Sequence, residues 1–121
     1  MTNRQKLIKD CGKLWSELVL TRDGHQCRAK SKACWGKVDP HHIVPRTWKA
    51  TVFMPDNGLS LCRHHHSHDM PDYLNNLCMG IVGKQTFLEL WSVAKRGRTW
   101  KEYELEEVKV SLKQELERIK T

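Results

Sequence analysis

The fold of this 121-residue chain is decided by two stretches, Asp39-Pro40-His41-His42-Ile43-Val44-Pro45-Arg46 and Asp56-Asn57-Gly58-Leu59-Ser60-Leu61-Cys62-Arg63-His64-His65-His66. Residues 37–43 and 58–61 are candidate strands, and the second alternates leucine with polar neighbours. The Asp-Asn-Gly triplet before the second strand is a strong turn signal. A helix is expected to begin near Cys62 and to end before the next proline, because proline is poorly tolerated inside a helix. This window therefore predicts two short strands followed by a short helix.

Helices are expected on both sides of this window. Residues 4–22 place apolar side chains at spacings of three, four and seven, the stripe of an amphipathic helix. The polar residues 24–40 predict a loop or knuckle. The last third is predicted to be helical, with a capping box at Thr99-Trp100-Lys101-Glu102 opening a final helix. The apolar stripe of that helix is Leu105, Val108, Leu112, Leu116 and Ile119.

The predicted fold class is α+β, in a single domain spanning residues 1–121. Its parts are an N-terminal helix (1–23), a knuckle with the two-strand core (24–70) and a helical tail (71–121). A mass of 14.2 kDa excludes a two-domain enzyme. Apolar residues make up 39% and charged residues 29%, which is typical of a globular protein. No apolar run approaches the length of a membrane span, and the first residues lack a hydrophobic stretch, so we expect a cytoplasmic location.

Positive charge is concentrated in the first four fifths of the chain. Lysine and arginine total 21 against 14 aspartate and glutamate residues, and residues 1–98 carry sixteen of the basic and eight of the acidic side chains. An excess of this kind favours a polyanionic partner, most simply nucleic acid, although solvated lysines alone would also produce it.

Cysteine and histidine form the most specific pattern. Five cysteines are an odd number in a chain without a secretion signal, which argues against a disulfide framework and favours metal binding. Six of the seven histidines fall at two places, residues 41–42 and 64–68. Cys11 and Cys78 lie in apolar patterns and are expected to be buried core residues. Trp48, in the long loop between the strands, either stacks on an unpaired base or anchors the loop.

The two opening stretches resemble the HNH endonucleases, also called His-Me finger or ββα-metal nucleases. Leu14-Trp15-Ser16-Glu17-Leu18 and Arg22-Asp23-Gly24-His25-Gln26-Cys27 extend the resemblance, which covers residues 14–66. The chain is most similar to phage and prophage members of the NinG and Rap type, which act in recombination. The resemblance implies a ββα-metal finger and a phage- or prophage-encoded protein of a bacterial host cell.

By this resemblance, His41 and His66 bind a catalytic divalent ion and His42 is the general base. Asn57 fixes the loop so that the His42 ring is aimed. Hydrolysis of a phosphodiester needs such a base to activate water and a cation to neutralise charge on the phosphate, and an imidazole pKa near 6.5 suits the base. Magnesium, manganese or another divalent ion fits the catalytic site. Whether His68 adds a further ligand stays open.

A second metal is implied to be structural zinc. Its ligands are three sulfurs and one nitrogen: Cys27, Cys34, Cys62 and His65. The zinc would attach the knuckle to the catalytic finger. DNA contacts are expected from Arg46, Lys49 and Arg63, with His64 facing solvent or phosphate.

Three function classes follow from these patterns. The leading one is a metal-dependent DNA endonuclease that nicks or cuts duplex or branched DNA and leaves 5′-phosphate and 3′-hydroxyl ends, as HNH relatives do. The second is a non-catalytic zinc module that binds nucleic acid. The third is an accessory subunit whose tail, through the stripe of residues 105–119, docks on a larger phage protein. A homodimer and a phage protein partner both stay open.

Overall fold

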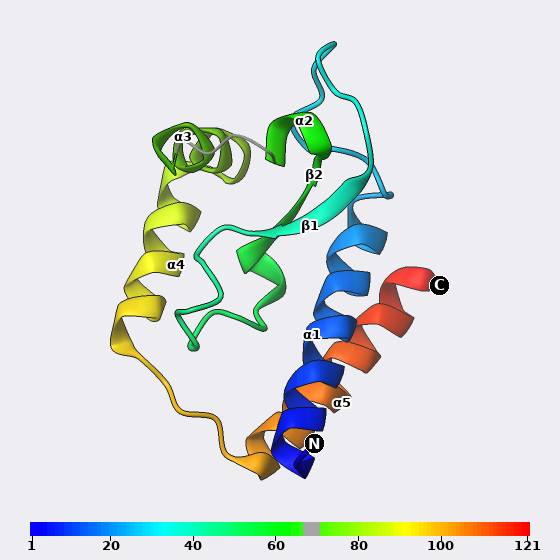
Figure 1. The fold of residues 1–121 in the computed structure, drawn as a ribbon, viewed down its shortest axis with the longest axis vertical. Coiled ribbons are helices and arrows are strands. Elements are labelled where there is room, and N and C mark those ends of the chain that lie inside the picture. The colour runs from blue at the N-terminus through cyan, green and yellow to red at the C-terminus, as the bar shows by residue number, and fades with distance from the viewer. Residues whose placement is uncertain (67–70) are drawn as a thin grey trace.

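The computed structural model describes residues 1–66 and 71–121 and has an α+β fold (Figure 1). Two strands form one antiparallel sheet, and a single 3-10 turn, η1 (Pro55–Asn57), precedes the second strand. The strands are β1 (Val38–His42) and β2 (Gly58–Cys62). The helices are α1 (Asn3–Arg22), α2 (Arg63–His66), α3 (Pro71–Val82), α4 (Lys84–Arg96) and α5 (Glu102–Lys120). The predicted strands and the amphipathic first helix are thus confirmed to within a few residues.

The hairpin keeps continuous register although β1 contains a proline. Pro40 pairs with Ser60, between the pairs Asp39–Leu61 and His41–Leu59. Both backbone groups of Ser60 point away from β1, because its N–H donates to the Asp23 carboxylate (2.9 Å) and its carbonyl accepts from the Arg28 N–H (2.8 Å). Pro40 therefore occupies a non-hydrogen-bonded pair, where the missing N–H removes no ladder bond.

The segment after α1 covers the outer edge of β2. Asp23 ends the helix, and its nearly buried carboxylate binds the Arg22 guanidinium as well as the Ser60 N–H. Burial raises the pKa of Asp23, but these hydrogen bonds outweigh it and leave the pKa below its ordinary value. Arg22 also donates to the carbonyls of Pro55 (2.9 Å) and Gly58 (2.7 Å). The Arg-Asp-Gly segment thus attaches α1 to the beginning of β2.

Helices α1 and α5 pack side by side and run in the same direction, as Figure 1 shows at the two labelled termini. Polar pairs along the seam set this direction, since residues 3, 10 and 17 meet residues 102, 109 and 120 in order. The apolar faces meet between them: Leu7, Cys11, Trp15 and Leu18 from α1, and Leu105, Leu112 and Leu116 from α5. The stripe expected to reach a partner protein is thus covered by α1.

A second buried group joins the hairpin to α3 and α4, so the hairpin lies between two helix pairs (Figure 1). Cys78 is buried here and Cys11 is buried under α5, which confirms both as core residues. Trp48 packs edge-on against Trp91 of α4, with ring centroids 5.4 Å apart, and so anchors the long loop. Within residues 1–66 and 71–121, every helix is too short or too polar to cross a membrane.

One predicted boundary is wrong. The capping box was expected at residues 99–102, but α5 begins at Glu102 and its N-cap is Lys101. The Lys101 N–H donates to the Glu104 carboxylate (3.0 Å), which supplies the acidic half of the motif two residues later than expected. Trp100 lies before the helix, where its ring contacts Phe53 and its indole N–H donates to the Lys49 carbonyl.

Candidate metal centre and histidine cleft

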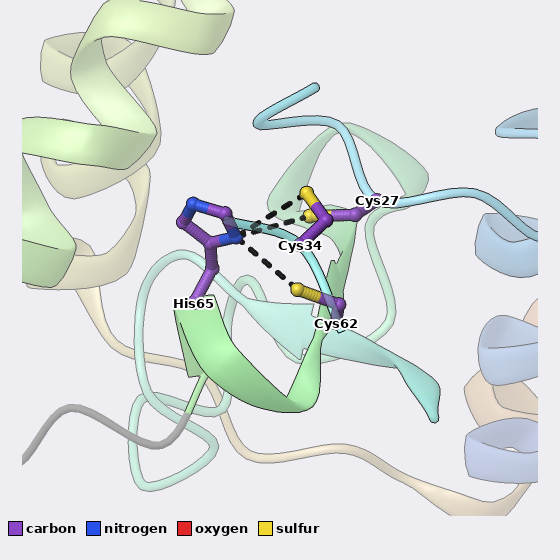
Figure 2. A group of neighbouring side chains, drawn as sticks. All are labelled: Cys27, Cys34, Cys62 and His65. Carbon is purple, nitrogen blue, oxygen red and sulfur yellow. Dashed lines mark hydrogen bonds between the residues drawn. The ribbon is translucent and has the colours of Figure 1, made fainter. Parts of the chain in front are cut away.

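Four predicted zinc ligands converge beside the start of α2 (Figure 2). The Nδ1 atom of His65 lies 3.2 Å from the Cys62 sulfur and 3.6 Å from the sulfurs of Cys27 and Cys34. All four ligand atoms lie within 4.8 Å of one another. In a tetrahedral zinc site, bonds of about 2.3 Å to sulfur and 2.0 Å to nitrogen place these atoms about 3.5 Å apart. The cluster therefore has the chemistry and the spacing of a zinc site.

The surroundings of the cluster act in opposite directions on two of its thiols: burial raises the pKa of Cys27, whereas the pKa of Cys62 is lowered. Cys62 and His65 are buried. Burial raises the pKa of the Cys62 thiol, but hydrogen bonds from His65 and from the Trp35 backbone outweigh it and lower that pKa to about 6. The other ring nitrogen of His65, Nε2, lies 3.3 Å from the Ser31 hydroxyl. Such a contact fixes the ring orientation of a metal-binding histidine.

The other predicted histidines lie on the opposite side of the hairpin end. His41 and His42 come from the last two residues of β1, and His66 comes from the end of α2. All three line one cleft of about 410 Å³. The rings of His41 and His66 meet edge-on with centroids 4.9 Å apart. Two imidazoles that share one ion through bonds of about 2.1 Å have a similar separation of ring centroids.

His42 is held on two sides. Its ring stacks on the Trp15 ring of α1, with centroids 3.7 Å apart and planes 6° from parallel. Its Nε2 atom lies 3.0 Å from the Val52 carbonyl oxygen. Since a carbonyl only accepts, Nε2 carries the proton and Nδ1 keeps the lone pair. The sequence pattern places Trp15 in the core. It does not indicate this contact, because α1 and β1 are distant in the sequence and meet only in the folded protein.

The pKa values of these histidines differ from the expected value near 6.5. Burial is the main cause, and it lowers the pKa of both His41 and His42 to about 4. Neighbouring His66 and His42 lower the pKa of His41 further, and Arg46 does the same for His42 against the opposing effect of the Val52 carbonyl. Both rings are therefore neutral at pH 7, the form that offers a lone pair to an ion or to water.

Asn57 closes the loop that carries the Val52 carbonyl. Its fully buried side chain accepts from the Val44 N–H (2.7 Å) and donates to the carbonyls of Val44 and Thr51 (both 3.1 Å). These bonds join the two ends of the loop between β1 and η1. Because Thr51 precedes Val52, Asn57 also positions the acceptor for His42. The role expected of Asn57 in aiming the His42 ring stays a prediction.

Glycine is required at position 58 for a reason other than the turn that the sequence indicates there. It adopts ordinary extended backbone, with φ at −130°. A Cβ at this position would lie 2.5 Å from both the Trp15 ring and the Val19 side chain. Gly58 also pairs with His42 across the hairpin. Glycine is therefore needed here for space, because it lets the Trp15 ring lie against β2 next to His42 of β1.

The expected DNA contacts fall at two places. Arg46 lines the histidine cleft, and Lys49 lies three residues further along the same loop, where its ammonium donates to the Arg46 carbonyl. Arg63 lies over Gly36 at the knuckle, away from the cleft-lining residues. His64 meets the His65 ring edge-on, with centroids 5.0 Å apart. His68 lies outside the described residues.

The comparisons with known proteins add no relative. No protein-family model, no curated protein and no solved structure matches this chain. The case for a function therefore rests on the geometry of the two sites.

Proposed function

We propose that this protein is a metal-dependent DNA endonuclease of the HNH type, with β1, β2 and α2 as its ββα-metal finger. The observation that carries the proposal is the arrangement around His42. A neutral imidazole with a fixed tautomer lies in one cleft with a histidine pair whose spacing fits a divalent ion. A general base beside an ion is the minimum that phosphodiester hydrolysis requires.

In this proposal the chain's residues divide the work. His41 and His66 hold the divalent ion, which would stabilise the charge that builds on the phosphate and the leaving oxygen. His42 takes a proton from the attacking water through Nδ1, while Val52 and Trp15 keep its ring in place. Arg46 at the cleft wall attracts the phosphate. Asn57 is a positioning residue, because it acts through the loop.

The zinc cluster has a separate role in the proposal. Zinc on Cys27, Cys34, Cys62 and His65 would attach the knuckle to β2 and α2, and the closed set of four protein ligands is typical of structural sites. A two-stranded hairpin is marginal by itself, so a structural ion would add stability where it is needed.

The test is cleavage of supercoiled plasmid and of a synthetic four-way junction by zinc-loaded protein, with added magnesium, manganese or neither. The wild type is expected to cut only with added ion. His42→Asn should lower the rate by about 100-fold or more, because it removes the imidazole base. His25→Asn makes the same change at an exposed histidine and should cut at the wild-type rate.

Either of two results would overturn the proposal. The first is cleavage by His42→Asn at the wild-type rate, which would remove the base. The second is DNA binding by folded, zinc-loaded wild type without any cutting of either DNA, which would favour the non-catalytic zinc module.

A further inference from the structure

A second hollow adjoins the histidine cleft and is more than twice as large. This groove, of about 940 Å³, lies between α1, the loop that follows β1, and the connection from α4 to α5. Ser16, His42 and Arg46 line both the groove and the cleft, so the two are continuous. Figure 1 shows the connection running from α4 to the beginning of α5, beside the first turns of α1.

The rim of the groove is strongly basic. Six cationic side chains line it, against one carboxylate, that of Glu17. Glu17 is already paired with Lys120 at 3.0 Å. Among the six, only Arg98 has an ion pair, to Glu104, in the part of the chain that the structure describes. The cations are Arg4, Lys9, Lys13, Arg46, Lys49 and Arg98. This charge fits a polyanion that lies along the groove.

The floor of the groove is apolar, with Ile8, Gly12, Val52 and Phe53 among its residues. Ile8 is 40% exposed, so its side chain offers apolar surface to a ligand in the groove. Gly12 sits inside α1, and a Cβ added there would meet no atom within 4 Å. Packing therefore does not require glycine at this position, and its absence of a side chain leaves the floor open.

The walls of the groove are fixed before any ligand binds. The Trp100 indole N–H donates to the Lys49 carbonyl at 2.8 Å, and the Arg4 guanidinium donates to the Trp100 carbonyl. The Arg98 guanidinium stacks on the Trp100 ring, 3.8 Å from its centroid. Three segments that are distant in sequence are thus tied together around the groove, and little ordering would be left for binding.

We propose that this groove binds an unpaired DNA strand and leads it to His42. A duplex would place only phosphates against the apolar floor, because its bases are stacked inside. Single-strand binding grooves combine a basic rim for the phosphates with aromatic side chains on which bases stack, and Phe53 and Trp100 are aromatic residues of this lining. The direction toward His42 rests on the proposed function. The substrate class is then DNA in which an unpaired stretch adjoins the scissile phosphate.

The first test measures binding by fluorescence anisotropy, without added magnesium or manganese. The probes are an oligothymidine of about twelve nucleotides and a duplex of similar length. We expect the wild type to bind the single strand more tightly. Lys9→Gln/Lys13→Gln should weaken this binding about tenfold and reduce the slope of log affinity against log salt by about 1.4, because each phosphate contact on a single strand contributes about 0.7. Lys84→Gln/Lys113→Gln is the control with the same charge change outside the groove, and its slope should equal that of the wild type.

The second test blocks the floor without changing charge. Gly12→Leu projects a side chain into the groove and should weaken single-strand binding at least tenfold, while the far-ultraviolet circular dichroism and the melting temperature stay at or above wild-type values. Gly80→Leu is the control at a second open glycine in a helix, α3, and should bind like the wild type.

The outcomes separate this inference from the proposed function. Equal or tighter binding of the duplex, or unchanged single-strand binding by both groove variants, would overturn the inference even if the wild type cuts DNA. Single-strand binding that both groove variants lose would support the groove even if no DNA is cut, and the failure would then lie with the proposed catalytic site.

Discussion

The zinc cluster and the histidine cleft use neighbouring residues of one short helix in different ways. His65 points to three cysteines and completes a set of four donors, with Cys62 and His65 buried. His66 points to the other side, where it meets His41 in a hollow that stays open. A metal surrounded by four protein ligands has no position for a substrate, whereas a metal held by few ligands does. Two adjacent residues of one helix thus belong to a closed set of four donors and to an open cleft.

Removal of a zinc ligand should have the largest effect of the changes considered, on zinc content and on the stability of the fold. Cys62→Ala is expected to lose the bound zinc and to destabilise the fold by several kcal/mol, since zinc binding in small domains contributes roughly 10 kcal/mol. Cys78→Ala removes another buried thiol and should retain zinc. Zinc content per chain and the unfolding midpoint measure the difference. Equal zinc content in both variants would show that the cluster does not hold the ion.

Loss of Asn57 should affect the cleft while the cluster keeps its zinc. Asn57→Ala leaves one N–H and two carbonyls of the loop without their buried partner, which costs about 3 kcal/mol. Cleavage should fall more than zinc content, because the Val52 carbonyl is no longer positioned for His42. Asn76→Ala on α3 is the exposed control and should change stability by less than about 0.5 kcal/mol. Urea unfolding and cleavage rates provide both readouts, and full activity in Asn57→Ala would refute its positioning role.

A single methyl group added at Gly58 should affect the histidine cleft and leave the zinc cluster unchanged. Gly58→Ala forces the Trp15 ring away from the strand, at a cost of about 1–3 kcal/mol for overpacking. The His42 ring loses its stacking partner, so the cleavage rate should fall while zinc stays bound. Gly80→Ala, at an open position in α3, should instead stabilise the protein slightly. Tryptophan fluorescence and cleavage would detect the change; an unchanged Trp15 environment would contradict it.

The smallest effect should come from removing the Ser31 hydroxyl that contacts the His65 ring. Ser31→Ala removes the hydroxyl that contacts Nε2 of His65, so zinc affinity should fall about tenfold, the lower end for such contacts. Stability in excess zinc should stay unchanged, because the four ligands remain. Competition with a colorimetric chelator measures the affinity. Wild-type affinity in this variant would show that the Ser31 contact does not orient the ring.

The sequence was most informative where chemistry depends on local spacing. Cys62 and His65 lie three residues apart at a helix start, and the resemblance together with this spacing predicted a zinc set with Cys27 and Cys34, whose four ligand atoms the fold brings together. The two strands followed from alternation and from the turn signal. The roles of His41, His42 and His66 stay predictions, although the structure brings the three into one cleft.

Contacts between distant segments could not be predicted in the same way. Nothing in the pattern around Trp15 shows that its ring stacks on His42, or that Gly58 must lack a side chain to permit it. Lys9 and Lys13 read as the solvated face of a helix, and only the approach of residues 98–100 makes them the rim of a groove. The first two features depend on how α1 packs against the hairpin, and the third depends on how close residues 98–100 come to α1.

The parallel pairing of α1 with α5 has a consequence for the order of folding. The zinc ligands are all present once residue 65 has been made, so the metal cluster can form early. The surface of α1 that packs on α5 waits for about fifty further residues, which take several seconds at ribosomal rates. Because α1 supplies Trp15 to His42, we expect the histidine cleft to mature last. A newly made chain would then be able to bind zinc at the cluster well before the histidine cleft is complete.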